Sequence, residues 1–168
     1  MLGLVNKRVY NRDSTLQQPN ASVTLLTSLD NLGPIFFDYR EQSNTQWDFV
    51  DFVLSACENG ALRSGDFLVA DNAAVHGGSA SFDTLCEILE TFKVQLVFLP
   101  AYSPELNPCE LMFSLMKRWL RSGKSNPQMD ILERIVEALG RIGFNDVLSA
   151  YRHCIYPKQV LPELHFIN

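Results

Sequence analysis

The sequence predicts a mixed α/β layer fold in which helices cover a sheet, and three observations support this prediction. Two short apolar runs, residues 67–70 and 94–99, are typical of buried parallel strands. Segments with apolar residues at helical spacing precede, separate and follow these runs. Two β-prone segments joined by turn residues come earlier in the chain and predict an antiparallel hairpin. An antiparallel hairpin beside parallel strands with crossover helices is therefore expected.

Composition limits the class of protein. The chain has 168 residues, of which 46% are hydrophobic and 20% charged, as expected for one globular domain with a sizeable core. A net charge of −5 argues against nucleic-acid binding by bulk electrostatics, so any such binding must be local. No apolar run approaches a membrane span, and no signal-peptide core begins the chain. The cysteines show no C-x-x-C pair, which disfavours a zinc site or a disulfide framework: Cys57, Cys86, Cys109 and Cys154.

The first half of the chain is expected to contain a hairpin and one helix. Residues 1–20 are polar and without a period, so an irregular start is predicted before a core over residues 21–156. Residues 21–28 and 34–39 are β-prone and are separated by turn residues, which predicts the hairpin. A helix over about residues 43–59 follows, and Ser43 and Gln46 have capping-box spacing.

The second half alternates strands and helices. The strand over residues 67–70 leads directly into Asp71, and a helix is expected after residues 77–79. The strand over residues 94–99 leads into a loop with two prolines. Asn107 as cap and Pro108 as first residue predict a helix to about Arg121. Helices are expected over residues 130–142 and from a cap at residues 145–146 to about 154, before an extended tail over residues 157–168.

Two acidic residues lie at positions where a catalytic or metal-binding site is expected. Asp71 follows a buried strand, at the sheet edge where open α/β folds bind ligands, although an Asp there also caps turns. Glu110 is the third residue of its helix, which also fits a capping box with Asn107. The proline-rich loop before Glu110 is more rigid than a cap requires. Two carboxylates on rigid elements suit Mg²⁺, which binds one or two carboxylates together with water and phosphate.

The stretches ADNAAVH and VFLPAYSPELNPCELMFSLMKRWLR closely resemble the catalytic core of mariner-like transposases of the DDE superfamily. In that family a strand ends in D-N-x-x-x-H, and L-P-x-Y-S-P-x-L-N-P-x-E precedes a helix with a K-R run. The resemblance implies a ribonuclease H-like mixed sheet flanked by helices. It also implies that Asp71 is the second and Glu110 the third of three catalytic acids, which bind Mg²⁺ or Mn²⁺.

The family's first acid has no counterpart in the expected elements. It ends an apolar strand that precedes the hairpin, whereas Asp13 lies in a polar stretch, and Asp30 and Asp38 belong to the hairpin itself. We therefore expect the chain to lack the first, central strand of the ribonuclease H-like sheet. On this interpretation the chain begins inside the catalytic domain, without the end-reading region of the family.

The resemblance implies metal-dependent DNA strand cleavage and transfer in transposition and DNA integration. Transposon ends and target DNA are the implied partners, and a homodimer is an allowed assembly. The chain is expected to be inactive alone, and to reside in the nucleus if eukaryotic or otherwise in the cytoplasm. The alternative is a domesticated, non-catalytic DNA-binding or assembly module. A phosphoesterase built on Asp71, Asn72 and His76 has little support, because the chain has only 3 histidines.

A set of basic side chains completes the candidate site. Lys117, Arg121 and Lys124 recur at helical spacing after Glu110, with Arg118 adjacent, and can track DNA phosphates. A solvated basic helix face is the alternative. His76 either helps to position substrate or is an ordinary loop histidine.

Overall fold

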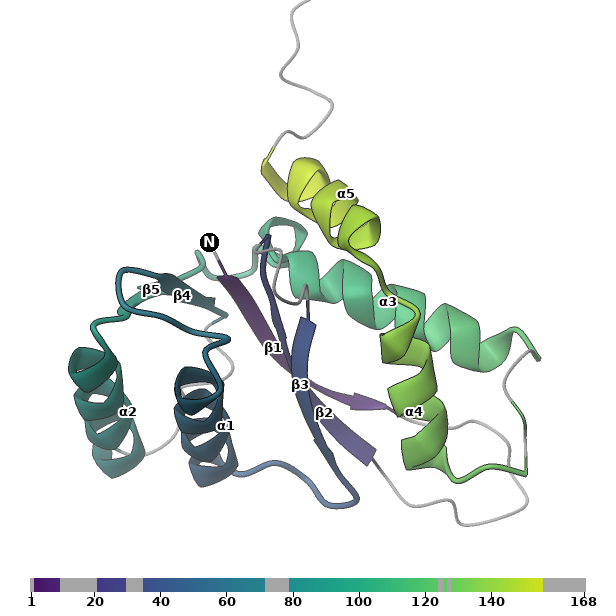
Figure 1. Cartoon of the computed structure of the whole chain (residues 1–168), viewed down its shortest axis with the longest axis horizontal. Coiled ribbons are helices and arrows are strands. Elements are labelled where there is room, and N and C mark those ends of the chain that lie inside the picture. Colours follow the sequence, from purple (N-terminus) through teal and green to yellow (C-terminus); the bar gives the residue numbers. More distant parts are fainter. Residues whose placement is uncertain are drawn as a thin grey trace, which may run out of the picture.

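The computed structural model describes residues 2–9, 21–29, 35–71, 79–123, 126 and 128–155. Within these ranges, five strands form one sheet in the order β3-β2-β1-β4-β5. The helices α1 and α2 lie on one side of the sheet, and α3, α4 and α5 lie on the other (Figure 1). In the described ranges no helix is long and apolar enough to cross a membrane.

The strands form an antiparallel meander that continues into a parallel pair. β2 pairs antiparallel with both β1 and β3, whereas β4 pairs parallel with β1 and β5. The strands are β1 Leu2–Val9, β2 Ala21–Thr27, β3 Ile35–Arg40, β4 Phe67–Ala70 and β5 Gln95–Phe98. The helices are α1 Gln46–Glu58, α2 Ser79–Phe92, the 3-10 turn η1 Pro104–Leu106, α3 Pro108–Arg121, α4 Ile131–Gly140 and α5 Phe144–Ile155.

This arrangement confirms the predicted hairpin, which is formed by β2 and β3, and the parallel strands with their covering helices. The prediction that the central strand is missing is wrong. β1 occupies the centre of the sheet, so residues 2–9 are not irregular as expected. The remainder of the predicted irregular start, residues 10–20, and the predicted tail, residues 157–168, lie outside the described residues.

The reason for this error is that β1 has little strand signal of its own. Its sequence, LGLVNKRV, combines Gly3 with three consecutive polar residues and shows no alternation of apolar and polar positions. The strand is held instead by ladders to two neighbours, β2 along seven residue pairs and β4 along three. Both neighbours pair with it over residues 3–4, and β2 alone pairs with residues 5–9. A local sequence pattern does not reveal such long-range contacts.

The sheet has a hydrophobic core on each face. Alternate residues of β2 supply both cores, because side chains alternate along a strand: Leu25 packs on the α3 side and Leu26 on the α1 side. The core on the α3 side also contains Phe113 of α3 and Tyr151 of α5. The core on the α1 side contains Leu68 of β4. A sheet buried on both faces is what the apolar strand at residues 67–70 predicts.

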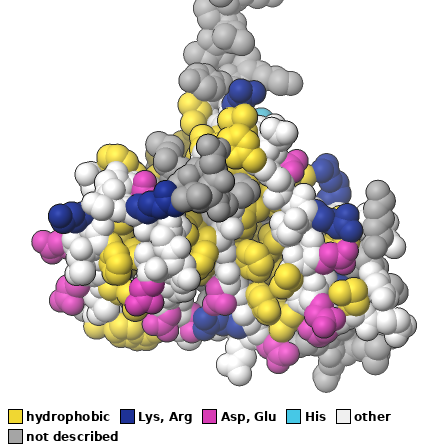
Figure 2. All heavy atoms as spheres, in the orientation of Figure 1, with side chains coloured by type: hydrophobic (Ala, Val, Ile, Leu, Met, Phe, Trp, Pro, Cys, Tyr) yellow, Lys and Arg dark blue, Asp and Glu magenta, His cyan; other side chains and the backbone are white. Residues whose placement is uncertain are grey.

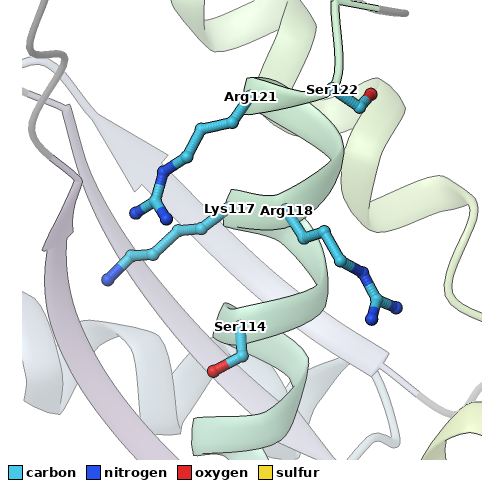
Figure 3. Close-up of a pocket in the computed structure, with 5 residues that line it drawn as sticks. All are labelled: Ser114, Lys117, Arg118, Arg121 and Ser122. Carbon is cyan, nitrogen blue, oxygen red and sulfur yellow. The ribbon is translucent and has the colours of Figure 1, made fainter.

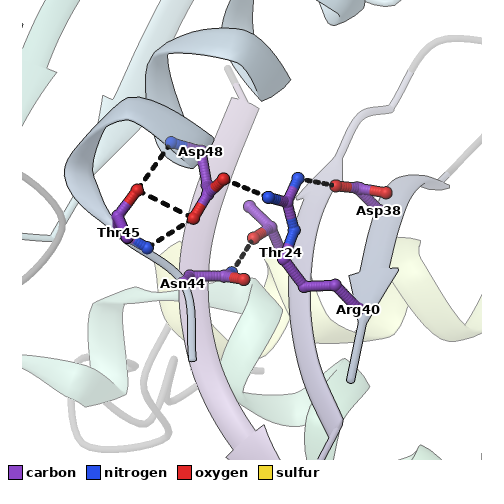
Figure 4. Close-up of polar contacts among 6 residues, drawn as sticks. All are labelled: Thr24, Asp38, Arg40, Asn44, Thr45 and Asp48. Carbon is purple, nitrogen blue, oxygen red and sulfur yellow. Dashed lines mark hydrogen bonds and ion pairs between the residues drawn. The ribbon is translucent and has the colours of Figure 1, made fainter. Parts of the chain in front are cut away.

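The N-terminus of α1 is tied to the edge strand β3 by a polar network (Figure 4). Arg40 pairs with Asp48 of α1 and, at 2.7 Å, with Asp38 of its own strand. The predicted capping box of Ser43 and Gln46 is wrong, because Thr45 caps the helix and forms the box with Asp48. The Thr45 amide donates to Asp48 Oδ2 at 2.6 Å, so one carboxylate caps the helix and binds an arginine.

This network makes part of the stability depend on pH. The hydrogen bond from the Thr45 backbone and the Arg40 charge lower the pKa of Asp48 below its usual 3.8. The contribution is therefore present above about pH 4 and is lost as pH falls through the folded-state pKa. We expect Asp48→Asn to cost about 1 kcal/mol at pH 7 and less at pH 2. Urea unfolding at both values measures this. Asp51→Asn, at an exposed position of the same helix, is the control, and an equal loss in both variants would contradict the assignment.

Candidate active site and nucleic-acid interface

Asp71 follows the last residue of β4, as predicted. Leu68, Val69 and Ala70 before it are all buried, so the strand is held firmly inside the sheet. The Leu99 amide donates to the Ala70 carbonyl at 2.9 Å, which extends the pairing with β5 to the residue next to Asp71. Asp71 itself is half-buried, and its Oδ1 atom is shielded from solvent. The carboxylate thus stands at the carboxyl end of an interior parallel strand, where such sheets bind ligands.

Glu110 lies in the first turn of α3 and is also half-buried. The loop before it is ordered as the two prolines predict: η1 is closed by a bond from the Asn107 amide to the Pro104 carbonyl at 3.1 Å. Asn107 is buried, and its side chain accepts from the Cys109 amide at 3.0 Å, which confirms the predicted cap. The position of Glu110 is therefore set by a buried cap and a closed turn rather than by a free loop.

Cys109 fixes this helix end to the sheet. Its buried thiol lies 3.6 Å from the Leu25 carbonyl and 3.6 Å from Thr27 Oγ1, both on β2. Tyr151 of α5 closes the same cluster, because its hydroxyl donates to the Thr27 carbonyl at 2.9 Å. Sequence reasoning missed this cluster. The buried stripe on α3 was a usable signal, since it begins at Cys109 and continues through Met112, Phe113 and Met116.

The Cys109 thiol has a raised pKa. Burial raises the pKa of this thiol to about 12, with the Thr27 hydrogen bonds acting in the opposite direction. The Glu110 and Asp71 carboxylates raise it further, as smaller contributions than burial. Burial therefore keeps Cys109 a neutral thiol that anchors the start of α3 to β2.

These residues do not fit a complete metal centre of three acids. In the described part of the chain, no group of three or more His, Cys, Asp or Glu side chains is placed to hold an ion. The central strand β1 contains neither Asp nor Glu. Two carboxylates suit one hard cation that completes its shell with water and phosphate. They do not suit a pair of ions bridged by shared ligands.

A basic surface lies on the same helix, formed by Lys117, Arg118 and Arg121 together with Ser114 and Ser122. These side chains line a hollow of about 520 Å³ (Figure 3). Lys117 and Arg121, one turn apart, extend to one side of α3, whereas Arg118 extends to the other. Arg118 and Arg121 are exposed. The other predicted DNA-contacting residues, His76 and Lys124, lie outside the described residues.

The distance from Glu110 to the basic surface matches a short length of DNA duplex. From Glu110 to Arg121 the helix rises roughly 16 Å, about the length of five base pairs of duplex. The face shown in Figure 2 has acidic side chains along its lower edge and basic ones scattered among them. With a net charge of −5, the protein can attract DNA only where basic side chains are close together.

Comparison with known proteins identifies the family of this chain. A family described as "DDE superfamily endonuclease" matches residues 6–133, more than half of the chain. The catalytic domain of Mos1 mariner transposase superposes with a TM-score of 0.65 at 16% identity, over 91% of this chain and 76% of that one. A chain of a pre-cleavage Mos1 transpososome gives 0.66 at 14% identity, over 91% of this chain and 52% of that one.

A more distant likeness is to a simian T-cell lymphotropic virus intasome, with a TM-score of 0.56, 9% identity, and coverage of 99% of this chain and 60% of that one. No curated protein sequence matches. The chain spans about half the length of the transposase chains solved in DNA complexes. At these identities the structural likeness shows the fold, and the match over residues 6–133 shows the family. The chain belongs to the DDE superfamily endonucleases and has the mixed α/β fold of a ribonuclease H-like transposase catalytic domain.

Proposed function

We propose that this chain is the catalytic core of a DDE transposase that acts on DNA strands in transposition, with Asp71 and Glu110 as its metal ligands. The observation that carries the proposal is the placement of Asp71 directly after the interior strand β4 and of Glu110 in the first turn of α3, where Cys109 anchors the helix to β2. Relatives of the same fold were solved as a complex with a transposon end and as a paired-end complex with Mn. Mg²⁺ or Mn²⁺ and transposon DNA are the partners that we propose here.

The chain's own residues perform part of this task. Asp71 and Glu110 hold and orient a single divalent ion, whose chemistry would be the polarisation of a DNA phosphate. The basic surface binds phosphates further along the same strand and so places the DNA relative to the acids. A step that needs two ions has no third carboxylate in β1 to support it. We therefore propose that the chain alone binds metal weakly and does not cleave DNA.

Metal binding and nicking test this proposal together. We expect titration with Mn²⁺ to show weak binding that Asp71→Asn and Glu110→Gln each reduce at least tenfold, because each removes one of two charged ligands. Asp83→Asn, at an exposed position on α2, is the matched control and should leave binding unchanged. No variant should nick supercoiled plasmid above background. Equal Mn²⁺ affinity in all four proteins would refute the site, and nicking that Asp71→Asn abolishes would refute the claimed inactivity.

One observation favours a second function, that of a non-catalytic DNA-binding or assembly module. The basic surface is built entirely on α3, and it does not depend on an acid in β1. In such a module DNA affinity depends on Lys117 and Arg121, whereas Asp71 and Glu110 contribute nothing to it. The two functions therefore differ in which variants weaken DNA binding.

A further inference from the structure

A buried polar cluster lies beneath the start of α3 and joins three elements that are far apart in the sequence. Its members are Cys109 of α3, Thr27 at the end of β2 and Tyr151 of α5. Thr27 and Cys109 are 0% exposed, and Tyr151 is 2% exposed. Burial of hydroxyl groups among apolar side chains costs free energy unless each is hydrogen-bonded. A fully bonded cluster of this kind fixes the positions of the elements that it joins.

The hydrogen bonds of the cluster run from α5 through β2 to α3. The Tyr151 hydroxyl donates to the Thr27 carbonyl at 2.9 Å, and the Thr27 hydroxyl donates to the Tyr151 oxygen at 3.4 Å. The Cys109 thiol lies 3.6 Å from Thr27 Oγ1 and donates to the Leu25 carbonyl at 3.6 Å. The Thr27 hydroxyl therefore contacts both helices, α3 through Cys109 and α5 through Tyr151.

Cys109 is also held through its backbone, and it is the residue directly before Glu110. Its amide donates to the Asn107 side chain at 3.0 Å, and the Glu110 amide donates to the Asn107 carbonyl at 3.1 Å. Such cap bonds fix where a helix begins, but the first turn can still rotate about that point. Attachment of the Cys109 side chain to β2 removes this freedom. Because successive helix residues point about 100° apart, the direction of Glu110 then follows from that of Cys109.

The far end of α3 is held by other contacts. Arg134 of α4 donates to the Leu120 carbonyl at 3.3 Å, and the Arg141 guanidinium lies 5.0 Å from the centre of the Trp119 ring. The end of the helix that carries the basic surface is therefore fixed by α4 and the residue after it, whereas the end that carries Glu110 is fixed by β2 and α5.

We propose that Thr27 and Tyr151 are positioning residues for the metal site. Acting through Cys109, their hydroxyl groups fix the rotation of the first turn of α3 and so aim the Glu110 carboxylate at a divalent cation. This inference rests on the proposed role of Glu110 as a metal ligand. The two hydroxyl groups act without touching the ion, as the outer partners of metal ligands do. Apolar packing of α3 has no preferred direction, whereas hydrogen bonds do.

Mn²⁺ titration of the full chain tests the proposal, with free Mn²⁺ measured by electron paramagnetic resonance. Thr27→Val removes the hydroxyl that contacts Cys109 and keeps a side chain of nearly the same size. Tyr151→Phe removes the hydroxyl at the other end of the chain of hydrogen bonds. We expect each variant to weaken Mn²⁺ binding about tenfold, as loss of an outer partner of a ligand does. Thr27→Ser keeps the hydroxyl and should bind Mn²⁺ like the unmodified chain.

Thr24→Val is the matched control. Thr24 is 3% exposed on the same strand, and its hydroxyl accepts from the Asn44 side chain at 2.7 Å (Figure 4). Because side chains alternate along β2, Thr24 faces the α1 side of the sheet and Thr27 the α3 side. We expect both valine variants to unfold at lower urea concentration than the unmodified chain. Mn²⁺ affinity should fall in Thr27→Val alone, and DNA affinity without metal should fall in neither.

A second background tests the route through Glu110. Thr27→Val should cause no further loss of Mn²⁺ affinity when it is combined with Glu110→Gln, because the carboxylate that it positions is then absent. The same change combined with Asp71→Asn should still lower the affinity. Losses that multiply in the variant with Glu110→Gln would show that Thr27 supports the fold in general, and they would overturn the proposal.

The remaining outcomes also decide the question. Unchanged Mn²⁺ affinity in Thr27→Val and Tyr151→Phe overturns the proposal, as does an equal loss in Thr24→Val. If Thr27→Val does not fold, Tyr151→Phe decides by the same criterion, and if neither folds, a role in positioning alone is overturned. The proposed function fails separately, if Asp71→Asn and Glu110→Gln leave Mn²⁺ binding unchanged. If those two variants weaken binding and the hydroxyl variants do not, only this inference fails.

Discussion

Replacing Phe113 with alanine is expected to destabilise the protein by about 3–5 kcal/mol, a large part of the total for a domain of this size. Phe113 is only 1% exposed and belongs to the core between α3, α5 and β2. Alanine would remove most of a ring and leave a cavity that helices packed on a sheet close only in part. Because Phe113 lies between Glu110 and the basic surface, its packing also holds both parts of the site against the sheet.

Urea unfolding monitored by circular dichroism measures this effect as a lower midpoint with an unchanged slope. Tyr102→Ala is the matched control, since it also removes an aromatic ring but at a position that is 100% exposed. It should change the free energy of unfolding by less than about 0.5 kcal/mol. If Phe113→Ala lost no more stability than Tyr102→Ala, α3 would not be packed as described here.

The sequence predicts the two acids and their supporting elements well because each signal is local. Asp71 follows four apolar residues, and Asn107 with Pro108 specifies where α3 begins. Both patterns act through neighbours in the chain, as a cap or a buried strand does. The capping box of α1 shows the limit of such patterns. Ser43 and Gln46 have the right spacing, yet the helix is capped two residues later by Thr45 with Asp48.

What the sequence does not predict depends on contacts between distant segments. β1 forms because two partner strands pair with it, although its own eight residues show no strand period. The cluster that holds Cys109 joins residues 82 positions apart, Thr27 and Cys109, and 124 apart, Thr27 and Tyr151. Neither separation leaves a periodic trace in the sequence.

Replacing Lys117 and Arg121 together with alanine is expected to weaken binding to a nonspecific DNA duplex about tenfold at 50 mM salt. The two side chains extend to the same side of α3, so both can contact one DNA backbone (Figure 3). Each phosphate contact releases counterions on binding, and losing two contacts should reduce the slope of log K against log salt by about 2. Fluorescence anisotropy across a salt series gives both quantities.

Two sets of variants serve as controls for this DNA-binding measurement. Arg63→Ala with Lys93→Ala removes the same charge from exposed positions in two adjacent turns, where the Gly65 amide bonds the Lys93 carbonyl at 2.9 Å. This control pair makes an acidic protein more negative but removes no phosphate contact of the basic surface. It should therefore lower affinity only slightly and leave the salt slope nearly unchanged. An equal loss of affinity in both double variants would mean that DNA binding depends on the net charge of the protein and not on the basic surface. Glu110→Ala in the absence of metal should not weaken binding, because its carboxylate only repels phosphate there.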